Sequence, residues 1–192
     1  MHAEARLPYI KPEDMTEEQR EFYEAHNEAM KAMPYTWMLE GGELNGPSNS
    51  LLHNVTVGKA LFAVGRQTIR ESIQAVGVAI HEVAILAAVT GANAPYAIWA
   101  HTILAQKAGL SDDKIAAIVA GYASPDFTHE ERVAYELATA LLKPGPIPTI
   151  TYNRAVETFG EMSTMKLIYA IGSFKNTATI LNAYNEPIPA QE

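Results

Sequence analysis

The amino-acid sequence predicts an all-α protein, and three observations lead to that prediction. Apolar residues recur at helical spacing along nearly the whole chain, without the apolar–polar alternation of a half-buried strand. Thr-Glu-Glu-Gln at 16–19 and Thr-His-Glu-Glu at 128–131 are capping boxes, which mark helix starts. Pro95 and Gly109 bracket one segment in the order that helices prefer, with proline in the first turn and glycine after the last.

Residues 1–45 are expected to form an N-terminal helix and loop. The helix begins at the first capping box and ends near Met33, before Pro34. The loop over residues 34–48 is rich in Gly, Pro, Asn and Ser and includes Trp37. A loop of this length is often a lid or a binding loop, and a satellite hydrophobic cluster that holds it down is an equal alternative.

The remaining elements form a core over residues 46–182, followed by an extended tail over residues 183–192. A short turn, GANA, separates two strongly apolar helices, and a Pro-rich connector covers residues 143–151. In chain order, we expect one or two helices at 50–71, then helices at 76–90, 95–108, 111–123, 128–142, 152–160 and 163–182.

Length, cysteine content and charge restrict the class of function. A chain of 192 residues is expected to form a single domain with a sizeable core. The absence of cysteine excludes disulfides, thiol nucleophiles and cysteine-ligated zinc or iron–sulfur clusters. The 14 Lys and Arg against 22 Asp and Glu give a net charge of −8 without a basic cluster, so we expect no nucleic-acid partner.

No targeting or membrane segment is evident from the sequence. The N-terminal residues are polar and charged and lack the apolar stretch of a signal peptide. The most apolar run, residues 76–100, is interrupted by charged residues, glycine and proline, whereas a spanning helix needs roughly 20 continuous apolar residues. We therefore expect a cytoplasmic protein with no membrane partner.

A carboxylate stands in the apolar face of the helix expected at 76–90. Five positions of this helix share one stripe: Val78, Glu82, Ile85, Leu86 and Val89. Burial disfavours the charged form of a glutamate unless the side chain is paired, so Glu82 is a candidate catalytic residue. Alternatively, this face lies at a subunit seam and Glu82 reaches water or an arginine.

The next helix presents a histidine in the same way. His101 shares a face with Ala97, Leu104, Ala105 and Ala108. A lone histidine there is more often a satisfied core residue, but the GANA turn makes the two helices antiparallel neighbours, with Glu82 and His101 at similar heights. A carboxylate that orients an imidazole can move protons, so this pair is the predicted catalytic centre.

Other side chains near these helices are weaker, substrate-binding candidates. They are Tyr96, Trp99, His53, Arg66, Arg70 and His81. The two aromatic residues can wall a pocket, although such residues are usually core, and the arginines at i and i+4 can clamp a substrate carboxylate. His81 lies about 100° around the helix from Glu82, on another face. His81, Glu82 and His101 match no HExxH-like spacing, so no metal is expected.

Four segments together resemble the carboxymuconolactone decarboxylase family, which includes the AhpD-like alkylhydroperoxidases. They are GPSNSLLHN from Gly46, HEVAIL from His81, PYAIWAHTILAQKAGL from Pro95 and IGSFKNTATILNAYNEPIPA from Ile171. The resemblance covers most of the chain from Gly46 onward. It implies an AhpD-like helical domain built on a central antiparallel helix pair, assembled as a trimer or hexamer.

The resemblance also has implications for the site. Peroxidase members carry two cysteines before the histidine and a glutamate on the preceding helix. Here Ala94 and Ala97 stand in the cysteine positions, whereas Glu82 and His101 stand in the glutamate and histidine positions. Peroxidase chemistry needs a thiolate, so that activity is excluded. Many cysteine-free relatives have a Tyr-Glu-Trp-like pattern, which this chain lacks after Tyr96.

The predicted function is therefore that of a cofactor-free decarboxylase or lyase acting on a small carboxylic acid or lactone. Proton transfer by the Glu82–His101 pair would serve decarboxylation, isomerisation or elimination beside a carbonyl. The alternative is a non-catalytic helical oligomer that binds a small molecule or acts as a scaffold. The apolar character of several helices supports a homo-oligomer with the pocket near a subunit seam.

Overall fold

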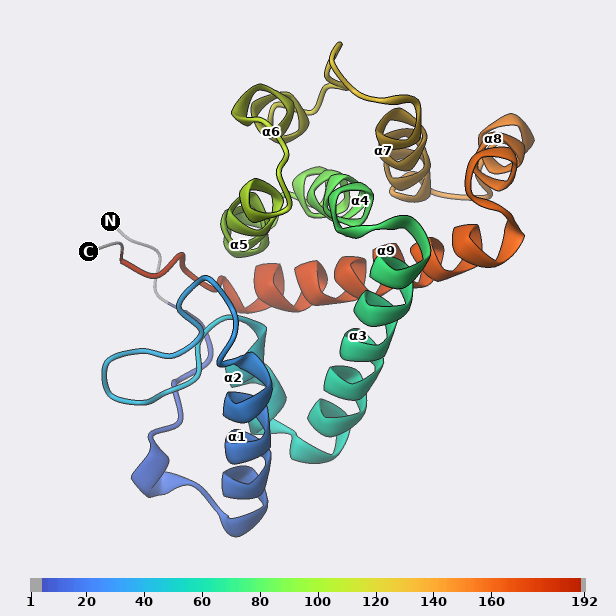
Figure 1. Ribbon diagram of the computed structural model, residues 1–192. Coiled ribbons are helices and arrows are strands. Elements are labelled where there is room, and N and C mark those ends of the chain that lie inside the picture. The colour runs from blue at the N-terminus through green and yellow to red at the C-terminus, as the bar shows by residue number, and fades with distance from the viewer. Residues whose placement is uncertain (1–4, 191–192) are drawn as a thin grey trace.

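The structure, a computed structural model, describes residues 5–190, and within them the all-α prediction is confirmed (Figure 1). The expected chain ends at 1–4 and 191–192 lie outside the described residues. The helices are η1 (Pro12–Asp14), α1 (Glu17–Met30), α2 (Pro47–His53), α3 (Val55–Val76), α4 (Val78–Gly91), α5 (Pro95–Lys107), α6 (Asp112–Val119), α7 (His129–Leu141), α8 (Thr149–Phe159) and α9 (Glu161–Tyr184).

Local sequence explains where these helices begin. Both capping boxes form, with Thr16 capping α1 and Thr128 capping α7. The expected segment 50–71 divides into α2 and α3 at Asn54, whose side chain accepts a hydrogen bond from the Val57 N–H at 3.2 Å. α4 begins at Val78 because Gly77 adopts φ of +84°, which ends α3.

Helix α4 lies in the middle of the molecule, in contact with α3, α5, α6, α7 and α9 (Figure 1). Every residue from His81 to Val89 is buried. The prediction of one buried stripe on this helix was therefore wrong. Over residues 81–89 α4 is covered on all sides, whereas Val78, a member of the predicted stripe in the first turn, is 45% exposed. The expected antiparallel pairing of α4 with α5 is present, because the turn between them is short.

Two hydrophobic clusters support the fold. The larger one is built mainly from α4 to α9. The smaller one joins Met15, Phe22, Leu44, Leu52 and Val55, and Trp37 of the loop packs against it. This confirms the satellite cluster beneath the loop. Because the smaller cluster includes residues of α2 and α3, its packing continues across the expected boundary at residue 46.

The two ends of the described chain lie side by side (Figure 1). The Arg6 N–H donates to the Tyr184 carbonyl oxygen at 2.8 Å. Glu186, which is buried, accepts hydrogen bonds from the Tyr9 hydroxyl at 3.0 Å and from the Gly46 N–H at 2.7 Å. The predicted extended tail therefore ties the N-terminal segment to the start of α2.

Candidate active site

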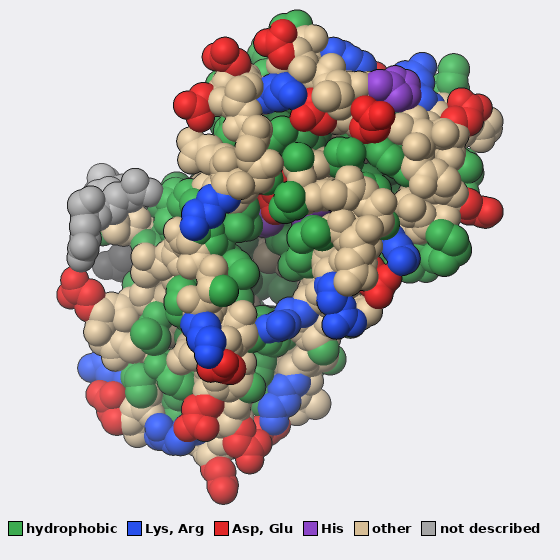
Figure 2. Space-filling model, viewed as in Figure 1, with side chains coloured by type: hydrophobic (Ala, Val, Ile, Leu, Met, Phe, Trp, Pro, Cys, Tyr) green, Lys and Arg blue, Asp and Glu red, His purple; other side chains and the backbone are tan. Residues whose placement is uncertain are grey.

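A cavity of about 510 Å³ opens between the N-terminal helices and the α4–α5 pair. Its walls come from α1, α2, α3, α4, α5 and α9, and from Met33 and Tyr35 at the start of the loop. Figure 2 shows it as a hollow lined by hydrophobic side chains, with histidine and acidic groups visible inside and basic side chains around it. The loop therefore contributes one wall of the cavity.

The Glu82–His101 contact expected from the sequence is present at the wall of this cavity. Nδ1 of His101 lies 2.9 Å from Oε2 of Glu82, and the two residues are 6% and 4% exposed. The short α4–α5 turn brings the side chains together at matching heights. The ring of Phe174 meets the His101 imidazole edge to face at 4.6 Å between centroids, which fixes the orientation of the imidazole.

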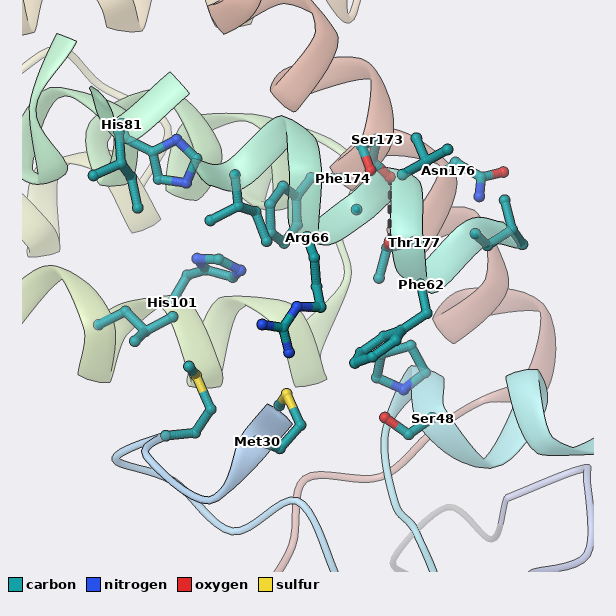
Figure 3. Close-up of a pocket in the computed structure, with 18 of the residues that line it drawn as sticks. Met30, Ser48, Phe62, Arg66, His81, His101, Ser173, Phe174, Asn176 and Thr177 are labelled. Carbon is teal, nitrogen blue, oxygen red and sulfur yellow. Dashed lines mark hydrogen bonds between the residues drawn. The ribbon is translucent and has the colours of Figure 1, made fainter. Parts of the chain in front are cut away.

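The two nitrogens of His101 have different surroundings. An ionised carboxylate only accepts hydrogen bonds, so pairing with Glu82 leaves the Nδ1 hydrogen as the donor. Nε2 makes no hydrogen bond with any residue between 5 and 190. In Figure 3 the ring projects from α5 into the cavity. Nε2 is therefore the nitrogen that can accept a proton from a bound molecule or return one to it.

His81, one of the predicted substrate-binding candidates, lines the same cavity, so the expectation that it faces away from Glu82 was wrong. It is 1% exposed, and its Nδ1 lies 2.9 Å from the Ser72 hydroxyl oxygen. Burial lowers the pKa of His81 to about 4, although the charge of Glu82 opposes that shift. His81 is therefore a neutral imidazole at pH 7, and it lies near His101 in the cavity (Figure 3).

The two arginines do not form a clamp. Arg66 on α3 lines the cavity, with its guanidinium carbon 5.7 Å from the centroid of the Phe62 ring. Arg70 lies outside the cavity and hydrogen-bonds to Gln67 on the surface. A spacing of four residues rotates the second side chain by about 40° on a helix, and here that rotation separates the two guanidinium groups.

Tyr96, Trp99 and His53 do not line this cavity, contrary to their prediction as substrate-binding residues. The Tyr96 hydroxyl donates to Oδ1 of Asn45 at 2.7 Å, beneath the loop. Trp99 packs edge to face against Tyr96 and against Tyr35, at 5.4 and 5.7 Å between centroids. His53 is exposed and its Nε2 lies 2.8 Å from the Pro8 carbonyl oxygen.

Several lining residues were absent from the sequence prediction. On α1 and α2, Nε2 of His26 lies 2.7 Å from the hydroxyl oxygen of Ser48. Burial lowers the pKa of His26 to about 4. Tyr35 also faces the cavity, and burial with the charge of Glu82 raises the pKa of its hydroxyl to about 12. No local pattern marks these residues, because the folding of α1 and the loop against α3 brings them to the cavity.

Helix α9 supplies a further wall through Ser173, Phe174, Asn176 and Thr177 (Figure 3). These residues belong to the SFKNT part of the segment that carries the family resemblance. The resemblance of that segment was the signal in the sequence that could have identified these residues. The spacing of residues within it does not show which face of the helix lines a cavity. The Thr177 hydroxyl donates to the Ser173 carbonyl oxygen at 3.2 Å.

Between residues 5 and 190, no group of three or more His, Asp or Glu side chains is arranged to hold a metal ion. None of the helices in that range combines the length and the apolar character needed to cross a bilayer.

Comparisons of the chain with models of known families, with curated proteins and with solved structures found no match. The resemblance to the carboxymuconolactone decarboxylase family stays a prediction from the sequence.

Proposed function

We propose that this chain is a cofactor-free enzyme of the carboxymuconolactone decarboxylase type, acting by proton transfer on a carboxylic acid or lactone. The observation that carries the proposal is the Glu82–His101 pair, which is buried and lies at the wall of a cavity large enough for a small molecule. His101 is the general acid and base, and Glu82 orients its imidazole.

The chemistry suits a substrate whose carboxylate lies β or vinylogous to a carbonyl group. Loss of CO₂ leaves the electron pair of the broken C–C bond in an enolate or dienolate, so no cofactor is needed as electron sink. The protonated Nε2 of His101 then returns a proton to carbon. Isomerisation beside a carbonyl begins instead with removal of a C–H proton by the neutral Nε2, which then returns it at another carbon; in elimination the same removal accompanies departure of a leaving group, which takes the proton with it.

The surroundings of the pair support this assignment. Phe174 and Glu82 contact the His101 ring from two sides and fix its orientation. The ring therefore loses less conformational entropy when substrate binds. His81 and Tyr35 are both neutral at pH 7 and supply hydrogen-bonding groups beside the pair. Such neutral donors can stabilise an enolate oxygen without competing for the proton.

Solvent deuterium exchange at carbon tests the proposal. The protein is incubated in D₂O with a panel of β-keto acids and carboxylated lactones, and deuterium incorporation and CO₂ release are followed by NMR. His101→Ala is expected to lower the rate at least about 100-fold and Glu82→Gln about 10-fold or more. The matched control is His129→Gln, which replaces an exposed histidine on α7.

An alternative is favoured by the same contacts: the pair ties α4 and α5 together and packs on α9, as a structural link in a non-catalytic binding protein would. In that case the parent protein catalyses no exchange and both variants only lower the melting temperature. Exchange that survives both substitutions in folded protein contradicts the assignment of His101 as the acid and base and of Glu82 as its partner.

The proposal also includes a homo-oligomer, trimeric or hexameric, in the cytoplasm. Its support is the apolar rim of the cavity, where Val64 and Val78 line the opening and are 55% and 45% exposed. Exposed apolar groups at an opening are covered in many proteins by a neighbouring subunit.

A further inference from the structure

The walls of the cavity are mostly apolar over a long stretch. α3 contributes Leu61, Phe62, Ile69 and Ile73, while Leu104 and Ile180 face them from α5 and α9. A ligand gains affinity for such a wall when apolar surface is removed from water. Each methylene group added to the ligand is expected to raise its affinity roughly threefold or more. A small polar acid would leave most of this surface without a partner.

Charged groups along the cavity are few and differ in their surroundings. Glu82, Arg66 and Lys107 are the charged lining residues within the described chain, leaving the histidines aside. Glu82 is engaged by His101, whereas Arg66 forms no ion pair with any residue from 5 to 190. Both cations are exposed; Lys107 lies at the end of α5, whereas the guanidinium of Arg66 lies over the ring of Phe62.

Arg66 is placed to hold an anion at the cavity. Its guanidinium lies over the Phe62 ring and projects between Met30 and His101 (Figure 3). Burial is the main cause of the lowered pKa of His26, and the nearby positive charge of Arg66 lowers that pKa further. The planar guanidinium fork suits a carboxylate through two parallel hydrogen bonds.

We infer that the ligand of this cavity is a monocarboxylate with an extended apolar body, whose carboxylate pairs with Arg66 and whose body lies along the apolar faces of α3 and α9. This inference rests on the proposed function only in taking the cavity as the substrate site. A reactive carbonyl part-way along the body is then within the space that His101 faces. A monocarboxylate that keeps its carboxylate on Arg66 has no second carboxylate to lose, so of the proposed reactions it undergoes isomerisation or elimination beside that carbonyl and not decarboxylation.

A second carboxylate at the far end of the same body is disfavoured. It would lie against apolar side chains or near the carboxylate of Glu82, and both situations penalise a negative charge. The affinity of the cavity for an acid therefore depends on the number of its charges as well as on its length. A neutral alcohol of the same length has no group that pairs with Arg66 and is also expected to bind more weakly.

Titration calorimetry with simple probes tests the inference on the full chain at pH 7.5. We expect binding of decanoate to be at least about 10-fold tighter than that of hexanoate, decan-1-ol or decanedioate. Arg66→Gln is expected to weaken decanoate binding at least about 10-fold. The matched control is Arg70→Gln, four residues along α3 and outside the cavity, which should stay within twofold; Lys107→Gln should stay within threefold.

Equal affinity for decanoate and decanedioate, an unchanged affinity in Arg66→Gln, or no binding of decanoate at millimolar concentration would overturn the inference. Because these titrations need no turnover, Glu82→Gln and His101→Ala separate the two proposals. If decanoate binding survives in both variants and no proton exchange occurs in the parent protein, the enzymatic proposal fails while this one stands. If exchange occurs on short diacids that decanoate does not displace, this one fails.

Discussion

Glu82 and His101, nineteen residues apart in the sequence, form a nearly solvent-free carboxylate–imidazole pair with 2.9 Å between Oε2 and Nδ1. Neighbouring helices supply the two groups, and the short α4–α5 turn sets their register. A buried pair of this kind couples energetically, because each partner offsets part of the cost of burying the other.

The coupling can be measured with a double-mutant cycle. His101→Ala leaves the Glu82 carboxylate buried without this partner and is expected to lower the free energy of unfolding by about 3 kcal/mol. The double variant, with Glu82→Ala added, should lose less stability than the sum of the losses in the two single variants. The difference, which is the coupling energy, is expected to be about 1 kcal/mol or more. Urea unfolding at pH 7 gives all four values; strictly additive effects would contradict a pair that acts as a unit.

Stability is expected to fall as the pH falls from about 6.5 to about 4. Burial lowers the pKa of both His26 and His81 to about 4, whereas the unfolded chain takes up these protons near pH 6.5. The unfolded state therefore binds more protons within this window, and each histidine contributes up to about 3 kcal/mol that is lost on acidification. Urea midpoints at pH 7, 6 and 5 measure the slope.

Two variants assign that slope to its source. His81→Gln should flatten the dependence on pH, while His129→Gln, at an exposed position, should keep the slope of the parent chain. A parent protein with equal urea midpoints at pH 7 and pH 5 would show that the buried histidines do not control acid stability.

Gly46 is required at the start of α2. Its φ of +63° suits glycine, and a Cβ placed there would lie 2.4 Å from Cζ of Tyr96. Gly46→Ala is expected to lower the free energy of unfolding by about 2 kcal/mol or more. Gly172→Ala is the matched control, because a Cβ there meets nothing within 4 Å inside α9, and it should stabilise by about 0.5–1 kcal/mol. Melting temperatures that shift equally would contradict this.

Glu186 joins the two ends of the described chain in a buried site. Burial raises its pKa, opposed by its hydrogen bonds from Gly46 and Tyr9, so its neutral form is favoured relative to an exposed glutamate. Glu186→Gln keeps an acceptor without the charge and is expected to be neutral or stabilising at pH 7. Glu186→Ala removes both hydrogen bonds and should cost about 1–3 kcal/mol. Thermal unfolding that ranks Gln below Ala would refute this account.

The apolar rim of the cavity predicts self-association. Light scattering after size exclusion is expected to give three or six times the chain mass of 20.9 kDa. Val64→Glu places a charge on the exposed rim and should lower the measured mass. The control is Val119→Glu, which changes an exposed residue of α6 away from the cavity and should leave the mass unchanged. A parent chain that elutes at its own mass would contradict the assembly.

Local signals in the sequence were sufficient for most of the helices. Capping residues such as Thr16, Thr128 and Ser111 mark where helices begin because they satisfy backbone N–H groups within three residues. The contact of Glu82 with His101 was also accessible, since a short turn between two helices leaves little freedom in their register. Both inferences use interactions that are close along the chain.

The environment of α4 depends on the whole fold. Its residues are apolar in nearly every direction, so no periodicity distinguishes a helix with one buried face from one buried all round, and the placement of His81 was lost with that distinction. For the same reason, sequence spacing did not separate Arg66, at the cavity, from Arg70, outside it.

An all-α chain without thiol chemistry, with a carboxylate and an imidazole on adjoining helices, therefore follows from local sequence alone. Only the packing of the whole chain shows which side chains share the cavity with that pair: His26 and Ser48 from the N-terminal helices, Arg66 from α3 and Phe174 from α9. The difference comes from distance along the chain. Helix caps and hairpin registers depend on neighbours a few residues away, whereas a cavity forms where helices far apart in sequence pack together.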